Sequence, residues 1–258
     1  MPERAREIRI VPNADELAPA AAAEIVRRAT EAVRTKGLFT VALAGGSTPK
    51  RCYSLLATDA SLKAQMPWER THFFWGDERH VPPDHPDSNY RMVHEAMLSK
   101  VPVPAANVHR IRSELADART AAAEYEQTLR DFFELGTGQL PRFDLVLLGM
   151  GADGHTASLF PGTEALSERR RLVVANWVEK FDSFRITLTL PVLNNAACVS
   201  FLVTGAEKAE TLRAVLEGEA GPEPYPSQLI QPVTGEPIWL VSREAARLLP
   251  SSASLPWA

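Results

Sequence analysis

The sequence predicts an α/β fold, a single-domain three-layer α/β/α arrangement with a mainly parallel central sheet. Short apolar runs alternate along the chain with longer segments of helical periodicity, which is the pattern of successive strand–helix–strand units. The 258 residues are 45% hydrophobic and 23% charged, an ordinary globular composition with enough length for a sizeable core. No linker, internal repeat or low-complexity tract divides the chain, so residues 1–258 are expected to form one domain.

Nine short apolar runs are expected to be the strands. Runs of this length that end at turn residues are typical of buried strands. The run Phe143–Leu148 is the most apolar of them and ends in a glycine-rich loop. In chain order the predicted strands are Ile8–Val11, Phe39–Ala44, His72–Trp75, Val108–Ile111, Phe143–Leu148, Leu172–Ala175, Arg185–Leu188, Val199–Thr204 and Ile238–Val241.

Six longer segments have the periodicity of helices. Asn13 and Glu16 have the spacing of a capping box at the start of the first helix, and Gly37 marks its end. The Pro- and Gly-rich segment Gly218–Gly235 is expected to be a long surface loop before the last strand. The predicted helices are Ala14–Thr35, Pro49–Ala57, Asn89–Leu98, Asp117–Phe133, Pro191–Ala196 and Glu207–Glu217.

Charge and cysteine content exclude several classes of protein. The net charge of −4 and the pI of about 5.9 argue against nucleic acid or a membrane surface as the main partner. No window approaches the roughly 20 apolar residues of a membrane span, and the charged segment Met1–Arg9 is not followed by the apolar core of a signal peptide. The two cysteines, Cys52 and Cys198, have no metal-type spacing and are too few for a disulfide scaffold. A cytoplasmic protein is therefore expected.

Polar motifs follow several of the predicted strands. Because ligands of parallel α/β sheets bind beyond the carboxyl ends of the strands, motifs that are scattered in sequence can converge on one cleft. Any anionic ligand of this acidic protein would need such a local cluster of basic groups. The motifs are Gly45–Lys50, Gly76–Arg79, Gly149–His155, Arg185 with Thr187, and Thr204–Lys208.

The loop Gly149–His155 combines an anion cradle with a possible general base. Its glycines allow backbone N–H groups to approach an anion closely. His155 is the residue type best suited to transfer protons near neutral pH. Asp153 could orient the imidazole ring or bind substrate hydroxyls, and spacing does not choose between these roles. The loop does not contain the Gly-x-Ser-x-Gly elbow of serine hydrolases.

Two further motifs predict a phosphate site. Gly45–Thr48 leads into a helix whose free N–H groups can bind phosphate, although a capped turn without a ligand explains the same residues. Lys208 lies in the first turn of a predicted helix, where the helix dipole disfavours a cation unless an anion binds nearby. Arg185 opens an otherwise apolar and threonine-rich strand. A solvated side chain is the alternative for each of these two cations.

The segment Asp77–Asp87 is polar, and its prolines stiffen it. Such a loop can hold charges at fixed positions over a cleft. His80, His85 and the aspartates suggest a metal site, but the segment contains no helical i, i+4 histidine pair and no thiolate. We therefore expect no metal here.

Taken together, these motifs resemble the 6-phosphogluconolactonase family. The resemblance runs in chain order from about residue 39 to 217, and its most specific block is Gly151–Pro161. The family shares its fold with glucosamine-6-phosphate deaminases, whose Asp-Gly-His loop continues as Ile-Ala-Phe-Asn-Glu-Pro. Here the loop continues as Thr-Ala-Ser-Leu-Phe-Pro, the lactonase form, and Arg79 stands where the deaminases tend to have tyrosine. The resembling segments are Ala44–Pro49, Trp75–Val81, Asp87–Tyr90, Asp144–Pro161, Arg185–Leu190 and Thr204–Ala209.

The resemblance implies an enzyme that hydrolyses 6-phospho-D-glucono-1,5-lactone to 6-phospho-D-gluconate in the oxidative pentose phosphate pathway. It implies no metal and no cofactor, a phosphorylated sugar lactone as the partner, and a monomer or a homodimer. His155 would activate water, Arg79 would stabilise the oxyanion, and Gly45–Thr48, Arg185 and Lys208 would hold the phosphate. The implied residues are His155, Arg79 and Asp153 for catalysis and Gly45, Gly46, Ser47, Thr48, Asp77, Glu78, Arg185 and Lys208 for substrate binding.

Two other functions stay open at this point. A sugar-phosphate isomerase or deaminase of the same fold could use Asp77 and Glu78 as carbon-acid bases. A non-catalytic sugar-phosphate sensor would need Lys208 and the glycine loop but not His155. The presence of both the cation and the histidine favours the enzyme.

Overall fold

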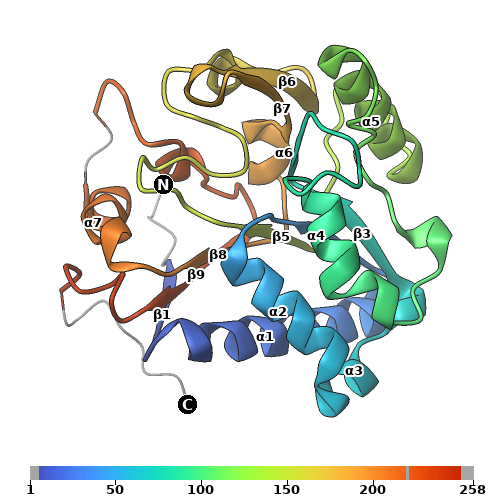
Figure 1. The fold of residues 1–258 in the computed structure, drawn as a ribbon, viewed down its shortest axis with the longest axis horizontal. Helices are drawn as coiled ribbons and strands as arrows, with labels where there is room; N and C mark the ends of the chain where they lie inside the picture. Colours follow the sequence, from blue (N-terminus) through green and yellow to red (C-terminus); the bar gives the residue numbers. More distant parts are fainter. Residues whose placement is uncertain (1–5, 219–220, 251–258) are drawn as a thin grey trace.

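The computed structural model describes residues 6–218 and 221–250. Its centre is a six-stranded sheet in the order β1-β9-β8-β5-β2-β3, and every neighbouring pair in it is parallel (Figure 1). This confirms the predicted α/β class and the parallel central sheet. The strands are β1 (Glu7–Val11), β2 (Phe39–Leu43), β3 (Thr71–Trp75), β5 (Leu145–Leu148), β8 (Cys198–Val203) and β9 (Glu236–Ser242).

A second sheet has three antiparallel strands in the order β4-β7-β6. They are β4 (Asp77–Arg79), β6 (Val173–Val178) and β7 (Ser183–Leu188). The apolar patterns at 172–175 and 185–188 do predict strands, but they carry no information about which strand each one pairs with. The strand β4 was not predicted, because three charged residues have no apolar pattern. Gly76 joins it directly to β3, so the second sheet stands at the carboxyl end of the first.

Helices cover both faces of the central sheet. In Figure 1, α1 and α2 lie below the sheet, whereas α5, α6 and the second sheet lie above it. Asn13 caps α1 by accepting from the backbone N–H groups of Asp15 and Glu16, and Gly37 ends it in the left-handed conformation, as predicted. The helices are α1 (Ala14–Lys36), α2 (Ser47–Thr58), α3 (Ala60–Gln65), α4 (Asn89–Ala96), α5 (Ala118–Phe132), α6 (Leu190–Asn194) and α7 (Ala209–Glu217).

Two predicted elements differ from the structure. The predicted strand 108–111 is wrong: Val108 makes a single parallel bridge to β3, and the chain then leaves the sheet edge while Ile111 turns into the core. The predicted helix 207–217 is split, because a 3-10 turn (Ala206–Lys208) precedes α7. Of the predicted loop 218–235, residues 219 and 220 lie outside the described part, and the remainder contains a 3-10 turn at Pro226–Leu229.

Apolar side chains from the sheet and the helices form the core. The largest fully buried ones include Trp75, Tyr53, Tyr125 and Phe201. Among the described residues, no helix is both long enough and apolar enough to cross a membrane. Both cysteines are free thiols buried in the core.

A half-buried histidine pair at the β3 edge predicts acid sensitivity. His72 Nδ1 lies 3.1 Å from His109 Nε2, and His109 stacks on Phe74. Burial and the neighbouring His72 lower the pKa of His109 from 6.5 to about 4, and burial lowers the pKa of His72. Between these pH values the unfolded chain binds protons that the folded chain does not. The free energy of unfolding should therefore fall as the pH decreases from about 6.5 to about 4.

The variant His109→Phe tests this, because phenylalanine keeps the ring stacking but cannot be protonated. Denaturant unfolding at pH 7.5 and pH 5 should show a smaller pH dependence for the variant than for the wild type. The exposed His94 provides the control, and His94→Ala should keep the wild-type slope. Equal slopes for all three proteins would show that the pair of His72 and His109 does not govern acid stability.

Candidate active site

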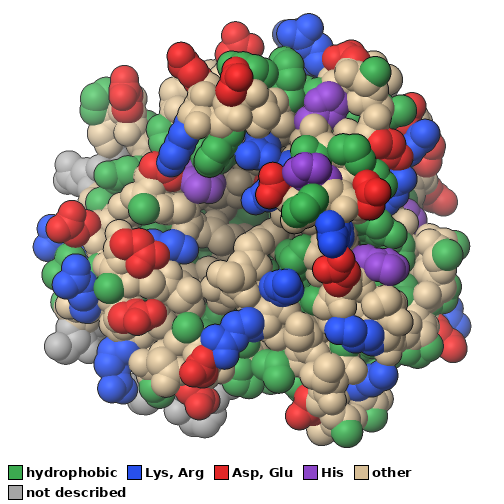
Figure 2. Space-filling view, in the orientation of Figure 1, with side chains coloured by type: hydrophobic (Ala, Val, Ile, Leu, Met, Phe, Trp, Pro, Cys, Tyr) green, Lys and Arg blue, Asp and Glu red, His purple; other side chains and the backbone are tan. Residues whose placement is uncertain are grey.

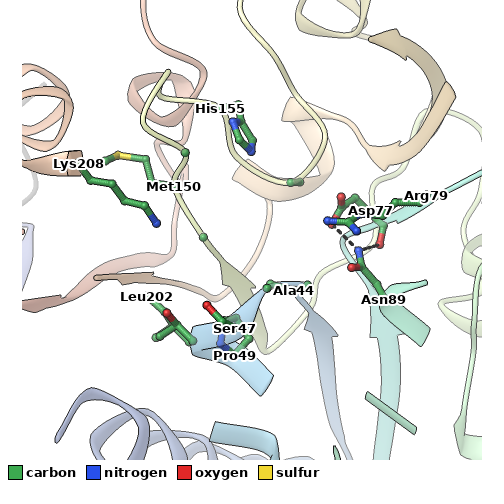
Figure 3. Close-up of a pocket in the computed structure, with 16 residues that line it drawn as sticks. Ala44, Ser47, Pro49, Asp77, Arg79, Asn89, Met150, His155, Leu202 and Lys208 are labelled. Atoms are coloured by element: carbon green, nitrogen blue, oxygen red, sulfur yellow. Dashed lines mark hydrogen bonds between the residues drawn. The ribbon is translucent and has the colours of Figure 1, made fainter. Parts of the chain in front are cut away.

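A cavity of about 260 Å³ lies where the carboxyl ends of the parallel strands meet the second sheet (Figure 3). Figure 2 shows this hollow near the centre of one face, with basic side chains and a histidine around it. The segments that follow β2, β3, β5 and β8 all contribute to its walls. Of the residues singled out in the sequence, its lining contains Gly45, Gly46, Ser47, Thr48, Asp77, Arg79, His155 and Lys208.

One wall is the amino end of α2. The helix begins at Ser47, with Gly46 as its N-cap, and no side chain caps it. The hydroxyl of Thr48 instead pairs with that of Thr204 at 2.9 Å. The capped turn that the sequence left as an alternative is therefore absent. The uncapped N–H groups and the helix dipole make this wall attractive to an anion.

Lys208 reaches into the cavity toward this wall (Figure 3). It occupies the N-cap position of α7, at the end of the 3-10 turn. Burial lowers the pKa of Lys208, and the charge of Glu207 offsets only part of this effect. Among the described residues, Lys208 Nζ has no hydrogen bond and no ion pair. A half-buried cation of this kind is stabilised by an anion in the cavity.

His155 enters the cavity from the opposite wall (Figure 3). Its Nδ1 atom makes a short hydrogen bond with Asp153 Oδ1, and Asp153 Oδ2 accepts from Lys180 Nζ at 3.3 Å. Burial alone would raise the pKa of Asp153, but the bonds to His155 and Lys180 lower it on balance. An ionised Asp153 keeps the proton on Nδ1 and leaves the Nε2 lone pair available. Ring orientation is thus the role that fits Asp153 best.

The imidazole ring of His155 makes close contacts with Phe160 and Gly151. It stacks on Phe160, with ring centroids 4.2 Å apart and planes 22° apart. The ring also lies so close to Gly151 that a Cβ at that position would overlap Nδ1. The glycine in the loop therefore makes room for the ring as well as for a tight turn.

Asp77 is buried at the rim shared by the two sheets. Its Oδ2 accepts from Ser158 Oγ at 2.7 Å, and its Oδ1 accepts from Asn89 Nδ2 at 3.4 Å. Asn89 Nδ2 also donates to the Asp77 carbonyl oxygen at 3.0 Å. The Asn89 amide nitrogen thus has two acceptors on Asp77, and the amide oxygen Oδ1 lies beside Gly45 in the cavity wall.

Glu78 lies outside the cavity lining. It is 1% exposed, and its carboxylate accepts from the backbone N–H groups of Arg79, Asn89 and Tyr90 and from the hydroxyl of Ser88. Burial raises the pKa of Glu78, while the three backbone donors act against this shift. This geometry indicates that Glu78 stabilises the amino end of α4 from outside the cavity.

Arg79 and Arg185 are directly opposite each other in the β4–β7 register. Burial, and then the charge of Arg79, lower the pKa of Arg185. Arg79 Nη1 donates to the Asp87 carbonyl oxygen at 2.8 Å, and the guanidinium of Arg185 lies over the Phe181 ring. The two cations therefore lie at one end of the site, where Asp77 and Asp87 are also present.

Arg185 is not in the same wall as Lys208. It lines an adjoining hollow of about 310 Å³, which shares Asp77, Arg79 and His155 with the main cavity. The structure therefore brings Gly45–Thr48 and Lys208 together, and it groups Arg185 with Arg79. Strand pairing decides this grouping, and sequence spacing cannot show it.

Four further residues belong to the site and were not singled out as ligand or catalytic residues. They are Asn89 in the cavity wall, Ser158 on Asp77, Phe160 under the imidazole, and Lys180 on Asp153. Asn89, Ser158 and Phe160 lie inside the motifs quoted for the family resemblance, so that signal was available. Lys180 lies outside every motif, and only the fold brings it to Asp153.

The chain is similar in sequence to a known family and to several of its members. Residues 12–239 match the family described as glucosamine-6-phosphate isomerases/6-phosphogluconolactonase. A 6-phosphogluconolactonase from Synechocystis sp. is 46% identical over 225 residues, which cover 87% of this chain and 90% of that protein. A 6-phosphogluconolactonase from Nostoc sp. is 42% identical over 240 residues, which cover 93% of this chain and 97% of that protein.

Solved structures agree with the sequence matches. The 6-phosphogluconolactonase from Trypanosoma brucei superposes with a TM-score of 0.84 at 30% identity, covering 95% of this chain and 99% of that one. A monomeric glucosamine-6-phosphate deaminase has a TM-score of 0.78 over 94% of this chain and 99% of its own. At 21% identity, the second match is a likeness of fold alone. The matches confirm the predicted family and fold, and the prediction of a hydrolase of that family.

Proposed function

This chain belongs to the 6-phosphogluconolactonase family, and we propose that it hydrolyses 6-phospho-D-glucono-1,5-lactone to 6-phospho-D-gluconate, a step of the oxidative pentose phosphate pathway. One observation carries the proposal. A histidine with one ring nitrogen held by a carboxylate faces, across a cavity, an uncapped helix end and a lysine without a partner among the described residues. This arrangement suits a ligand with a phosphate at one end and an acyl group at the other.

The phosphate end of the substrate would bind at Gly45–Thr48 and Lys208. The first N–H groups of α2 and the ammonium of Lys208 supply donors and positive charge for a dianion. Fixing the phosphate there would place the lactone carbonyl near His155 and Arg79, so that binding energy from a remote group orients the reacting atoms. Asn89 Oδ1 offers an acceptor for a sugar hydroxyl in the same wall.

The acyl end would react by general base catalysis. Nε2 of His155 takes a proton from water as the water oxygen bonds to the lactone carbonyl carbon. The guanidinium of Arg79 stabilises the negative charge that develops on the carbonyl oxygen. When the bond from the carbonyl carbon to the ring oxygen breaks, His155 returns the proton to that oxygen. The product is the open-chain acid, and every proton is accounted for without an additional reactant.

Arg185 was expected to join the phosphate site. Its place beside Arg79 supports a different role, in which it adds positive charge at the end of the cavity where the lactone carbonyl would bind and the product carboxylate would form. Asp77, held by Ser158 and Asn89, would keep the carbonyl end of the cavity rigid. Glu78 would act indirectly, by fixing α4 and with it Asn89.

One chain supplies every group that the proposed reaction requires. We propose that the chain works as one domain, either as a monomer or as a homodimer. The buried free thiols of Cys52 and Cys198 support a reducing compartment, and we infer a cytoplasmic location.

A pH-stat assay on freshly prepared 6-phosphogluconolactone tests the proposal. The purified protein should release acid well above the spontaneous rate of lactone opening, and it should release no ammonia from glucosamine 6-phosphate. Acid release at the spontaneous rate would overturn the assignment. Ammonia release would favour the deaminase instead, and tight binding of 6-phosphogluconate without turnover would favour a sensor.

A further inference from the structure

The loop 151–155 carries Asp153 and His155, and two backbone hydrogen bonds connect residues within it. Gly154 N donates to Gly151 O at 3.0 Å, and Gly151 N donates to His155 O at 2.9 Å. These bonds determine the shape of the loop. They do not determine where the loop lies relative to the cavity, because both partners of each bond belong to the loop itself.

Besides Lys180, which donates to Asp153, two other elements hold the loop from outside. Ser227 donates to Gly154 O twice, from its backbone N–H at 3.0 Å and from its hydroxyl at 2.8 Å. Thr211, on α7, donates from its hydroxyl to Ala152 O at 2.6 Å. Both hydroxyl side chains are almost completely buried. The two carbonyl groups that they bind stand on either side of Asp153, so the residue that orients His155 is fixed from both directions.

The segment Tyr225–Gln228, which we call the brace, is itself fastened to α7. Gln228 Oε1 accepts from Tyr225 N at 3.0 Å, and Gln228 Nε2 donates to Ala214 O on α7 at 3.0 Å. The ring of Tyr225 packs on Gly154 so closely that a Cβ there would overlap it, and Gly154 also has a φ of +73°. The segment after α7 in Figure 1 thus returns to contact the loop that follows β5.

We propose that Ser227 and Thr211 are positioning residues for His155, and that the brace is the reason for the Pro- and Gly-rich segment before the last strand. The inference rests on the proposed function of the site. A general base acts only within hydrogen-bond reach of the proton it removes, and His155 lies on a loop rather than inside a helix or strand. Bonds from outside therefore fix the position of the loop relative to the cavity, which its internal bonds leave undetermined.

The variants Ser227→Ala and Thr211→Val test the inference from two separate elements. Each removes one buried hydroxyl and leaves the residues that contact substrate in place. We expect kcat for the lactone to fall about tenfold in each variant while KM changes less than twofold, since a displacement of His155 well below 1 Å affects chemistry and not phosphate binding. The amides of Gly151 and Gly154 should also exchange their hydrogens faster than in the wild type.

Thr71→Val is the matched control. Thr71 is fully buried at the opposite end of β3, and its hydroxyl donates to the Pro67 carbonyl oxygen at 2.9 Å. It should lose a similar amount of stability and keep the wild-type kcat. Wild-type kcat in both Ser227→Ala and Thr211→Val, with the wild-type protein active, would overturn the inference alone. A wild-type protein without lactonase activity would overturn the proposed function itself. If one variant does not fold, the other decides.

Discussion

Replacing His155 by alanine is expected to lower kcat for 6-phosphogluconolactone by about 10²–10⁴-fold, with little change in KM. General base catalysis by a positioned side chain contributes about this much. His155 is the histidine in the cavity wall, and its Nδ1 is engaged by Asp153, so its Nε2 is the nitrogen that can take a proton from water. The phosphate wall at Gly45–Thr48 stays intact in this variant, which is why binding should survive.

The measurement is acid release in a pH-stat, with the spontaneous opening of the lactone subtracted at each pH. His94→Ala serves as the control, because His94 is exposed on α4 and does not line the cavity. Asp153→Asn should have an intermediate activity. An amide cannot stabilise the imidazolium, but the imidazole ring stays stacked on Phe160. Full activity in His155→Ala would remove this residue from the reaction.

The parallel sheet and its helices were predictable because their signals are local. The apolar runs at 39–44 and 143–148 identify strands that lie in the interior of the sheet, and Asn13 and Gly37 mark the ends of α1 by their own side-chain and backbone chemistry. Each of these signals depends on residues that are close in sequence. Because both faces of the sheet are buried, its strands appear in the sequence as nearly continuous apolar runs.

The second sheet and its effect on the site were not predictable in the same way. Arg185 belongs beside Arg79 only because β7 pairs with β4 in one particular register. Neither strand indicates its partner, and β4 consists of three charged residues. The residues proposed from sequence for the phosphate site therefore included Arg185, which the fold places beside Arg79 in the adjoining hollow.

Contacts between side chains that are far apart in the sequence could not be predicted either. Lys180 lies 27 residues beyond the carboxylate that it contacts, and Ser227 lies 73 residues beyond the carbonyl that it holds. Nothing in the local pattern of the Gly218–Gly235 segment indicates that it returns to the loop with His155. Motifs identified which residues can do chemistry, whereas the residues that orient them depend on how the chain packs.

Replacing Lys208 by alanine is expected to lower kcat/KM for the phosphorylated lactone by about tenfold to hundredfold. A hydrogen bond to a charged group contributes about 1.5–3 kcal/mol, and each 1.4 kcal/mol corresponds to a factor of ten. Lys208 has no partner among the described residues, and burial lowers its pKa, so its charge is poorly stabilised until an anion binds. Removing the ammonium takes away that attraction and leaves the uncapped end of α2 to bind the phosphate alone.

The decisive measurement compares two substrates. Glucono-1,5-lactone has the same ring and carbonyl but no phosphate, so Lys208→Ala should leave its slow hydrolysis unchanged while turnover of the phosphorylated lactone falls. Lys63→Ala, on α3 and outside the cavity lining, should change neither rate. Arg185→Ala should instead impair both lactones, because Arg185 lies beside Arg79 near the carbonyl end and not in the wall with Lys208. If Lys208→Ala slowed both lactones equally, Lys208 would serve the reacting carbonyl, and the phosphate would have to bind beside the two arginines.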